Sequence, residues 1–190
     1  LLPHIDDVDL RDFIAFFALT AMRPSEIASL RWSSLDERAG VLRLEAAGAK
    51  VGHARILPIV EEIAAVLTSR KARRRTHVPF IFHNDGKPAT RRNGGFSKGW
   101  YSAWGRALKA AALPASTIVY DLRRSAIRAM RETGINDQTI MSISGHRTRS
   151  TFDRYVIVTT SDMADALRSV AGFVTRERGQ DAHKRGEKGQ

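Results

Sequence analysis

The chain of 190 residues contains no cysteine. This absence excludes disulfide bonds, cysteine-ligated metals and thiol nucleophiles, and it fits a reducing, cytoplasmic compartment. Long apolar runs are absent as well, because the longest, around "FIAFFALTAM", is interrupted by Thr20 and falls well short of the roughly 18 residues that a membrane-spanning helix needs. We therefore expect no membrane partner.

Acidic residues are scarce relative to basic ones. The chain carries 31 Lys and Arg against 20 Asp and Glu, a net charge of +11. A chain this basic is expected to bind a polyanion, and nucleic acid is the usual one, although ribosomal proteins are basic too. The six histidines occur without cysteines or paired carboxylates, so we expect no metal site and no cofactor.

The ends of the chain suggest a fragment. It begins "LLPHIDDVDL", without an initiating Met or a charged and then apolar leader, so we expect a piece of a longer protein. Residues 1–175 carry the patterns of one folded domain. Residues 176–190, "RERGQDAHKRGEKGQ", have no apolar pattern and are predicted to form a disordered basic tail.

Hydrophobic periodicity predicts an α+β fold that is mainly α-helical, with one small three-stranded antiparallel sheet. Arg23 falls in a sharp corner between two helices, because Pro24 begins the second one. Pro58 places its strand at a sheet edge or at its own end. The predicted helices are 8–22, one from Pro24 onward, 61–75, 96–113, 120–133, 136–143, 149–157 and 161–175, and the predicted strands are 40–45, 54–60 and 79–84.

Four segments, taken in order, resemble the tyrosine recombinase (phage integrase) family over roughly residues 8 to 175. They are "TAMRPSEIASLRW", "GAKVGHARILPI", "YDLRRSAIRAM" and "GHRTRSTFDRY". The resemblance implies the DNA breaking-rejoining fold of the family's catalytic domain. It also implies a site-specific recombinase that cleaves and rejoins DNA strands by transesterification, through a 3′-phosphotyrosyl intermediate and without a metal. Relatives usually carry an N-terminal DNA-clamping domain, and we expect that domain to be absent from this piece of the protein.

Two arginines are candidates for holding the phosphate that such a reaction attacks. A guanidinium donates two parallel hydrogen bonds and stays charged, so Arg23 and Arg123 suit its non-bridging oxygens. For Arg23 the alternative is a surface ion pair with Glu26. Helical geometry separates Arg123 from Arg124 by about 100°, so only one of them can face a site. The resemblance selects Arg123.

A lysine in the 46–53 turn is the candidate general acid for the departing 5′-oxygen of deoxyribose. The resemblance aligns the family's lysine with Lys50, whose alternative is a solvated turn residue. His53 is the rival, and we expect it to be a turn or DNA-facing residue.

Three tyrosines compete for the role of nucleophile. Tyr101 lies beside Trp100 and Trp104 and is expected to pack. Tyr155 follows His146 by nine residues, as the family's nucleophile follows its Gly-His pair. The resemblance therefore makes Tyr155 the attacking group and His146 a hydrogen-bond partner of the phosphate. For each, the alternative is an ordinary packing or capping residue.

Tyr120 departs from the family pattern, which has a histidine at the start of its His-x-x-Arg helix. A neutral phenol can donate a hydrogen bond to a phosphate but is a poor base at neutral pH. We therefore expect Tyr120 to position the phosphate, with water or Lys50 acting as the general base.

The expected partner is a double-stranded DNA attachment or recombination site of a bacterial or phage mobile element. In the full-length protein we expect a homotetramer on DNA, with the 161–175 helix docking on a neighbour, whereas this fragment could be monomeric. Arg91, Arg92 and Lys98 flank a Gly-rich loop and could touch the DNA backbone. The run "RKARRR" (70–75) is either a solvated helix end or a further DNA contact. Two other functions stay open: strand relaxation of the type IB topoisomerase kind, and non-catalytic DNA binding.

Overall fold

The computed structural model describes residues 1–44, 54–90, 96–155, 160, 163–164 and 166–172. Within these ranges, Lys98 is described without its side chain. The chain divides into two units, Leu1–Tyr155 and Val156–Gln190. The elements of the first unit, in chain order, are η1 (Leu2–His4), α1 (Val8–Thr20), α2 (Pro24–Ser29), η2 (Trp32–Ser34), β1 (Leu35–Asp36), β2 (Val41–Leu44), β3 (Arg55–Pro58), α3 (Glu61–Ala72), β4 (His83–Asn84), β5 (Lys87–Pro88), α4 (Lys98–Ala110), α5 (Val119–Glu132), α6 (Asp137–Ser144) and α7 (Arg149–Asp153).

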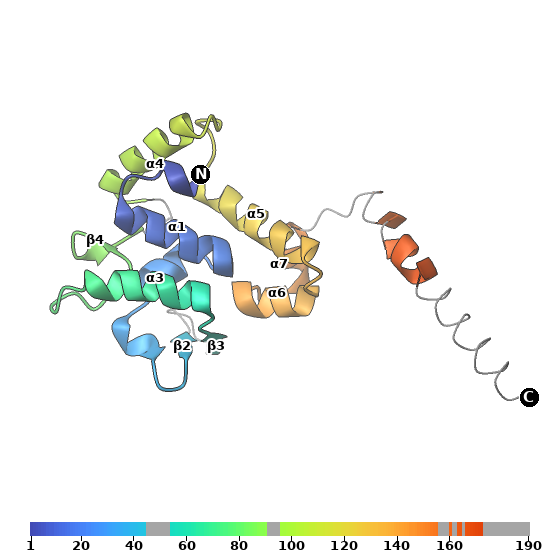
Figure 1. Ribbon diagram of the computed structural model, residues 1–190, viewed down its shortest axis with the longest axis horizontal. Helices are drawn as coiled ribbons and strands as arrows, with labels where there is room; N and C mark the ends of the chain where they lie inside the picture. Colours follow the sequence, from blue (N-terminus) through green and yellow to red (C-terminus); the bar gives the residue numbers. More distant parts are fainter. Residues whose placement is uncertain (45–53, 91–95, 156–159, 161–162, 165, 173–190) are drawn as a thin grey trace, which may run out of the picture. The chain divides into compact units, whose positions relative to one another are not determined.

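Helix α1 lies at the centre of the first unit and contacts both α3 and α5 (Figure 1). Its N-terminus is capped by Asp7, whose Oδ1 accepts a hydrogen bond from the backbone N–H of Leu10 at 2.9 Å. Aromatic side chains from α1, from the segment before β4, from the segment before α4 and from α4 itself form the middle of the core. They are Phe13, Phe16, Phe17, Phe82, Phe96, Trp100 and Trp104, all of them buried. Their mutual packing fixes the scaffold from which the site residues project.

The sheet is antiparallel with the order β1-β2-β3, which agrees with the expected small three-stranded sheet. Strand β3 is an edge strand and ends at Pro58, as the proline predicted. The prediction that 79–84 supplies the third strand was wrong, because that place is taken by Leu35–Asp36.

The 79–84 segment turns inward because its two central side chains both enter the core. Ile81 and Phe82 are consecutive and fully buried, whereas neighbours in a half-exposed strand point to opposite faces. His83–Asn84 forms strand β4 and pairs with Lys87–Pro88, and Phe80 makes an isolated antiparallel bridge with Arg31. The backbone N–H of Ile81 donates to the carbonyl of Leu30 at 2.8 Å, which joins this segment to the end of α2 instead.

Several helices are shorter than their periodicity predicted. Helix α1 ends two residues early because Ala21 adopts a left-handed conformation with φ 48°. Helix α7 ends at Asp153, so Tyr155 lies just beyond a helix and not within it. In the second unit, residues 160, 163–164 and 166–172 are helical, while the rest of the predicted 161–175 helix and the expected tail lie outside the described residues.

Candidate active site

Arg23 occupies the corner between α1 and α2, where the left-handed Ala21 turns the chain. Its backbone N–H donates to Oε2 of Glu26 at 3.1 Å, and its Nη1 lies 3.2 Å from Oε1 of the same carboxylate. The same Nη1 donates to the carbonyl oxygen of Gly145 at 3.0 Å. Arg23 therefore forms the anticipated ion pair and also reaches the turn directly before His146.

Arg123 projects from α5 and is 1% exposed. Its Nη2 donates to the carbonyl of Ser144 at 3.2 Å and lies 2.9 Å from Nε2 of His146. Its Nη1 is buried and has no hydrogen-bond partner within the described part of the chain. Burial, reinforced by the charge of Arg23, lowers the pKa of Arg123 to about 10, so it remains a cation at neutral pH. Arg124 points outward, 3.6 Å from Asp121.

His146 is buried next to Arg123, directly after the left-handed Gly145 that ends α6. Burial lowers its pKa to about 4, and the positive charges of Arg123, Arg23 and Arg55 act in the same direction against an opposing effect of Glu26. The imidazole is consequently neutral at physiological pH.

Tyr155 lies against both of these groups. Its ring centroid is 5.0 Å from that of His146, and the Cζ of Arg123 lies 5.7 Å from the Tyr155 ring centroid. The backbone N–H of Tyr155 donates to the carbonyl of Phe152 at 2.8 Å, which holds it in a tight turn after α7. The structure thus brings Arg23, Arg123, His146 and Tyr155 together from four separate segments.

Tyr120 is placed differently from these four. It is the second residue of α5, about one turn before Arg123, and is 36% exposed. It lies at the same end of α5 as Arg123 but is open to solvent.

Two residues of this cluster were missed in the sequence as site residues, Glu26 and Arg55. The Nη2 of Arg55 lies 3.2 Å from Oε2 of Glu26, so one carboxylate bridges Arg55 and Arg23. Although burial raises the pKa of Glu26, the charge of Arg55 and its hydrogen bond, with the backbone and charge of Arg23, outweigh burial and hold this pKa below its usual range. The sequence indicates Glu26 only as a partner of Arg23. Arg55 lies within the segment "GAKVGHARILPI", but its spacing indicates no role of its own.

Gly145 is required where Arg55 approaches the turn. A Cβ at this position would lie 2.6 Å from Nη1 and 2.7 Å from Cζ of Arg55, and the residue has φ +76°. Glycine alone meets both conditions without strain. The Gly-His pair of the sequence therefore has a structural reason: it lets two arginines close on the turn that carries His146.

The remaining expected site residues have no described position. Lys50, His53, Arg91 and Arg92 lie outside the described residues, and Lys98 begins α4 with a side chain that is not described. Their roles stay predictions.

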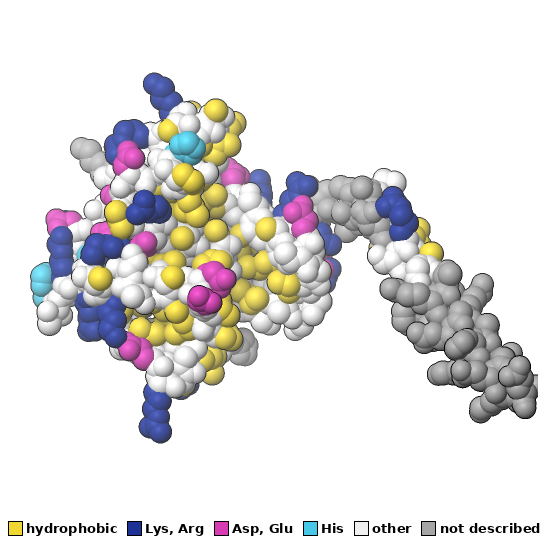
Figure 2. All heavy atoms as spheres, viewed as in Figure 1, with side chains coloured by type: hydrophobic (Ala, Val, Ile, Leu, Met, Phe, Trp, Pro, Cys, Tyr) yellow, Lys and Arg dark blue, Asp and Glu magenta, His cyan; other side chains and the backbone are white. Residues whose placement is uncertain are grey.

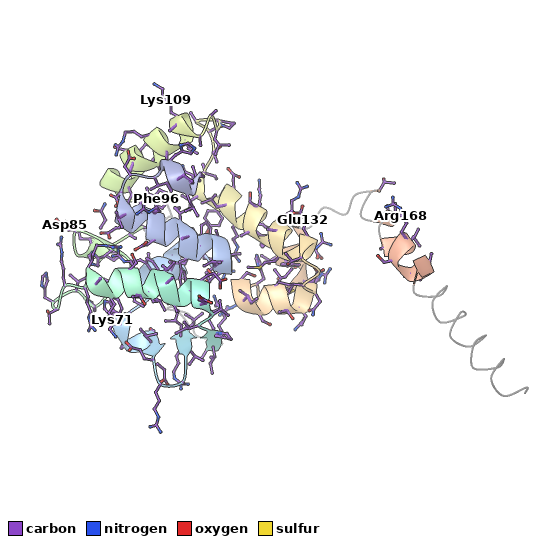
Figure 3. The ribbon with its side chains drawn as sticks, in the orientation of Figure 1. Lys71, Asp85, Phe96, Lys109, Glu132 and Arg168 are labelled. Carbon is purple, nitrogen blue, oxygen red and sulfur yellow. The ribbon has the colours of Figure 1, made fainter. Side chains whose placement is uncertain are left out.

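The basic run 70–75 is used mainly within the fold. Arg70 is buried, pairs with Asp9 and donates to the carbonyl of Ile81 at 3.0 Å. Lys71, near the end of α3, pairs with Glu37 at 2.7 Å (Figure 3). The other pairs of the run are Arg73 with Asp9 and Asp12, and Arg75 with Asp85. These contacts favour a structural role over DNA binding.

The expectation that Tyr101 packs with its tryptophan neighbours was wrong. Trp100 and Trp104 are buried, but Tyr101 is 70% exposed. Its position on α4 is turned by about 100° from that of Trp100, which is enough to bring it to the surface. Because Tyr101 is exposed whereas the cluster around Arg123 is buried, it offers a matched control for Tyr155.

Comparisons with known proteins agree on one family. A family model described as "Phage integrase family" matches residues 3–161 of this chain. The chain belongs to the phage integrase family. A shufflon-specific DNA recombinase of Escherichia coli is 33% identical over 138 residues, which are 72% of this chain and 31% of that protein.

Solved structures show the same fold as this integrase-family chain. The Tn1549 transposon integrase in complex with circular intermediate DNA has a TM-score of 0.63 and 22% identity, covering 87% of this chain and 61% of that one. The XerH recombinase bound to its difH substrate has a TM-score of 0.64 and 17% identity, covering 87% and 50%. The fold is therefore that of tyrosine recombinase catalytic domains, and the chain spans about a third of the curated relative and half to three fifths of these structures.

Two other kinds of feature are absent from the residues that the structure describes. No group of three or more His, Cys, Asp or Glu side chains there could hold a metal ion. No helix in the described ranges is long and apolar enough to cross a membrane.

The neutral His146 predicts a pH dependence of stability. Its pKa of about 4 lies below that of an unfolded histidine, so its contribution is fully present above about pH 6.5 and is lost as the pH falls toward about 4. We expect this contribution to be at most about 3 kcal/mol. Urea unfolding of the wild type and His146→Gln at neutral and mildly acidic pH would measure it, because the variant should lose less stability on acidification. Equal losses in both proteins would show that His146 does not titrate as described.

Proposed function

We propose that this chain is the catalytic domain of a site-specific DNA recombinase that cleaves and rejoins strands through a 3′-phosphotyrosyl bond to Tyr155. The observation that carries the proposal is Nη1 of Arg123, which is buried and has no hydrogen-bond partner among the described residues. It belongs to a guanidinium that lies beside His146 and Tyr155, near the turn that Arg23 contacts. A buried donor without an acceptor is costly, and a phosphate oxygen would satisfy it.

The two arginines supply the electrostatic part of the reaction. Attack on a phosphodiester builds negative charge on the two non-bridging oxygens, and Arg23 and Arg123 stabilise that charge from fixed positions. The hydrogen bond from Arg23 to the Gly145 carbonyl, and those of Arg123 to Ser144 and His146, hold both guanidiniums in place before DNA arrives. A preorganised pair needs little rearrangement during the reaction.

The covalent step exchanges one phosphodiester for another. The Oη of Tyr155 attacks phosphorus, the phenolic proton leaves, and the bond from phosphorus to the 5′-oxygen breaks. The departing 5′-oxygen takes a proton, which we assign to Lys50. The phosphotyrosyl bond has about the same free energy as the phosphodiester bond that was broken, so the reverse reaction can rejoin the strand.

The proposed substrate is a double-stranded recombination site in the cytoplasm, bound by a homotetramer of the full-length protein. The Tn1549 transposon integrase structure contains circular intermediate DNA and the XerH recombinase structure contains its difH substrate. One lambda integrase structure holds a dimer bound to a COC′ core site. Further backbone contacts are assigned to His53, Arg91, Arg92 and Lys98. In the view of Figure 2 the middle of the face over α1 and α3 is largely apolar, with Lys and Arg mostly at its margins, so DNA is not expected to lie there.

A pool of nicked, random-sequence duplexes tests the proposal without knowledge of the target. A nick close to the cut lets the short released strand diffuse away, so cleavage leaves the protein covalently joined to DNA. We expect adducts that survive denaturant, form in the presence of EDTA and are enriched for one sequence. DNA binding without adducts would favour a non-catalytic DNA-binding protein. Relaxation of plasmids of any sequence would favour topoisomerase-like activity.

Tyr120→His is expected to leave the cleavage rate unchanged or to raise it. Tyr120 can only donate a hydrogen bond to the phosphate at neutral pH, whereas histidine can donate one and also accept a proton. Single-turnover cleavage of a nicked duplex selected from the pool would measure the change. A collapse of activity in this variant would show that the phenol itself has a role histidine cannot supply.

A further inference from the structure

Ser144 is the last residue of α6 and is fully buried beside His146. Its Oγ lies 2.6 Å from the carbonyl oxygen of Ile140 and 2.7 Å from Nδ1 of His146. A carbonyl oxygen can only accept, so the single hydroxyl proton of Ser144 is donated to Ile140. The Oγ can then only accept from His146, and the proton of this neutral imidazole must reside on Nδ1.

Arg123 does not by itself select a tautomer. Its Nη2 lies 2.9 Å from Nε2 of His146 and 3.1 Å from Nδ1, so it approaches both ring nitrogens almost equally. The same Nη2 donates to the Ser144 carbonyl at 3.2 Å. The tautomer therefore rests on the Ser144 hydroxyl, which requires Nδ1 protonated and leaves Nε2 bare.

We propose that Ser144 is a positioning residue that fixes His146 in this tautomer, so that Nε2 receives the phenolic proton when Tyr155 attacks. The inference rests on the proposed function and deepens it, because it identifies the proton acceptor that a tyrosine at position 120 leaves missing. In the step, the Oη–H bond of Tyr155 breaks, its proton moves to Nε2, and Oη bonds to phosphorus. His146 becomes an imidazolium, and it returns the proton to Tyr155 when the strand is rejoined.

The surroundings of His146 suit an acceptor better than a donor to phosphate. The charged groups facing it are Arg123 from α5, Arg23 at the corner before α2, Glu26 from α2 and Arg55 from β3. Burial and the three arginines lower the pKa of the imidazole against the opposing effect of Glu26, so the ring is neutral. The Tyr155 ring lies against it with centroids 5.0 Å apart. A phosphate oxygen can bind Nη1 of Arg123, which has no hydrogen-bond partner among the described residues, while Nη2 keeps its bond to the Ser144 carbonyl.

Nitrogen NMR of the DNA-free chain tests the tautomer directly. Protonated and bare imidazole nitrogens differ strongly in ¹⁵N chemical shift, and His146→Gln identifies the signals that belong to this residue. We expect Nδ1 protonated and Nε2 bare in the wild type and in Ser144→Thr, with the preference lost in Ser144→Val. Threonine and valine have the same shape, so the pair differs only in the hydroxyl. A wild-type spectrum with the proton on Nε2 would overturn the inference.

Single-turnover cleavage tests whether this tautomer of His146 speeds the attack by Tyr155. We expect Ser144→Val to cleave roughly 10- to 100-fold more slowly than Ser144→Thr, as when a group that orients an active-site imidazole is lost. Ser142→Ala is the control, because Ser142 makes the same bond to a carbonyl one turn earlier, at 2.9 Å, but faces solvent. Equal rates for the Thr and Val variants would overturn the inference alone. A wild type that forms no covalent adduct would overturn the proposed function and the proton transfer with it.

Discussion

Tyr155→Phe is expected to abolish covalent attachment to DNA and to lower the cleavage rate by at least about 10⁴-fold, the scale seen when a catalytic nucleophile is removed. Phenylalanine keeps the ring that packs against His146 and Arg123, with centroid distances of 5.0 and 5.7 Å in the wild type, so the fold should be retained. Only the attacking oxygen is lost. DNA affinity should therefore change little.

The measurement is denaturant-resistant adduct formed on a nicked duplex, with binding followed separately by fluorescence anisotropy. Tyr101→Phe is the matched control, because Tyr101 is exposed on α4 and should cleave at the wild-type rate. Residual adduct in Tyr155→Phe at more than a few per cent of the wild-type level would contradict the assignment of the nucleophile.

Arg123→Lys is expected to lower the cleavage rate by about 10²- to 10³-fold, comparable to the loss of one preorganised oxyanion donor. Lysine keeps the charge but replaces the planar fork with a single ammonium. It cannot serve the Ser144 carbonyl, Nε2 of His146 and a phosphate oxygen at once, as the Nη1 and Nη2 groups of Arg123 can.

The matched control is Arg124→Lys, because Arg124 is the next residue on the same helix and pairs only weakly with Asp121 at the surface. Thermal unfolding of both variants separates lost stability from lost catalysis. If Arg123→Lys folds normally and cleaves at the rate of Arg124→Lys, Arg123 is a structural residue and the phosphate site lies elsewhere.

Much of the backbone framework around the site can be predicted from the sequence, because neighbouring residues determine where its helices and strands begin and end. Pro24 predicts the corner that carries Arg23, and helical geometry predicts that Arg123 and Arg124 face different ways. Pro58 likewise predicts an edge strand that ends there. In each case neighbouring residues alone decide the outcome.

The features that sequence reasoning missed depend on contacts between distant segments. Strand β1 has two residues, too short for an alternating pattern of buried and exposed side chains. The apolar 79–84 segment therefore gives the stronger strand pattern in the sequence, although it is not the third strand. Arg55 looks like an ordinary strand residue until Glu26 and Gly145 are found beside it. The role of Ser144 follows from two distances, to Ile140 and to His146, that no spacing rule supplies.

The central claim is that Tyr155 becomes joined to DNA beside the Arg23, Arg123 and His146 cluster. The most direct measurement is mass spectrometry of the adduct trapped on a nicked duplex, after digestion of both protein and DNA. We predict a nucleotide remnant on Tyr155, attached through a 3′-phosphate. A remnant on Tyr120 or Tyr101, or wild-type protein that binds the duplex but yields no modified peptide, would contradict the account.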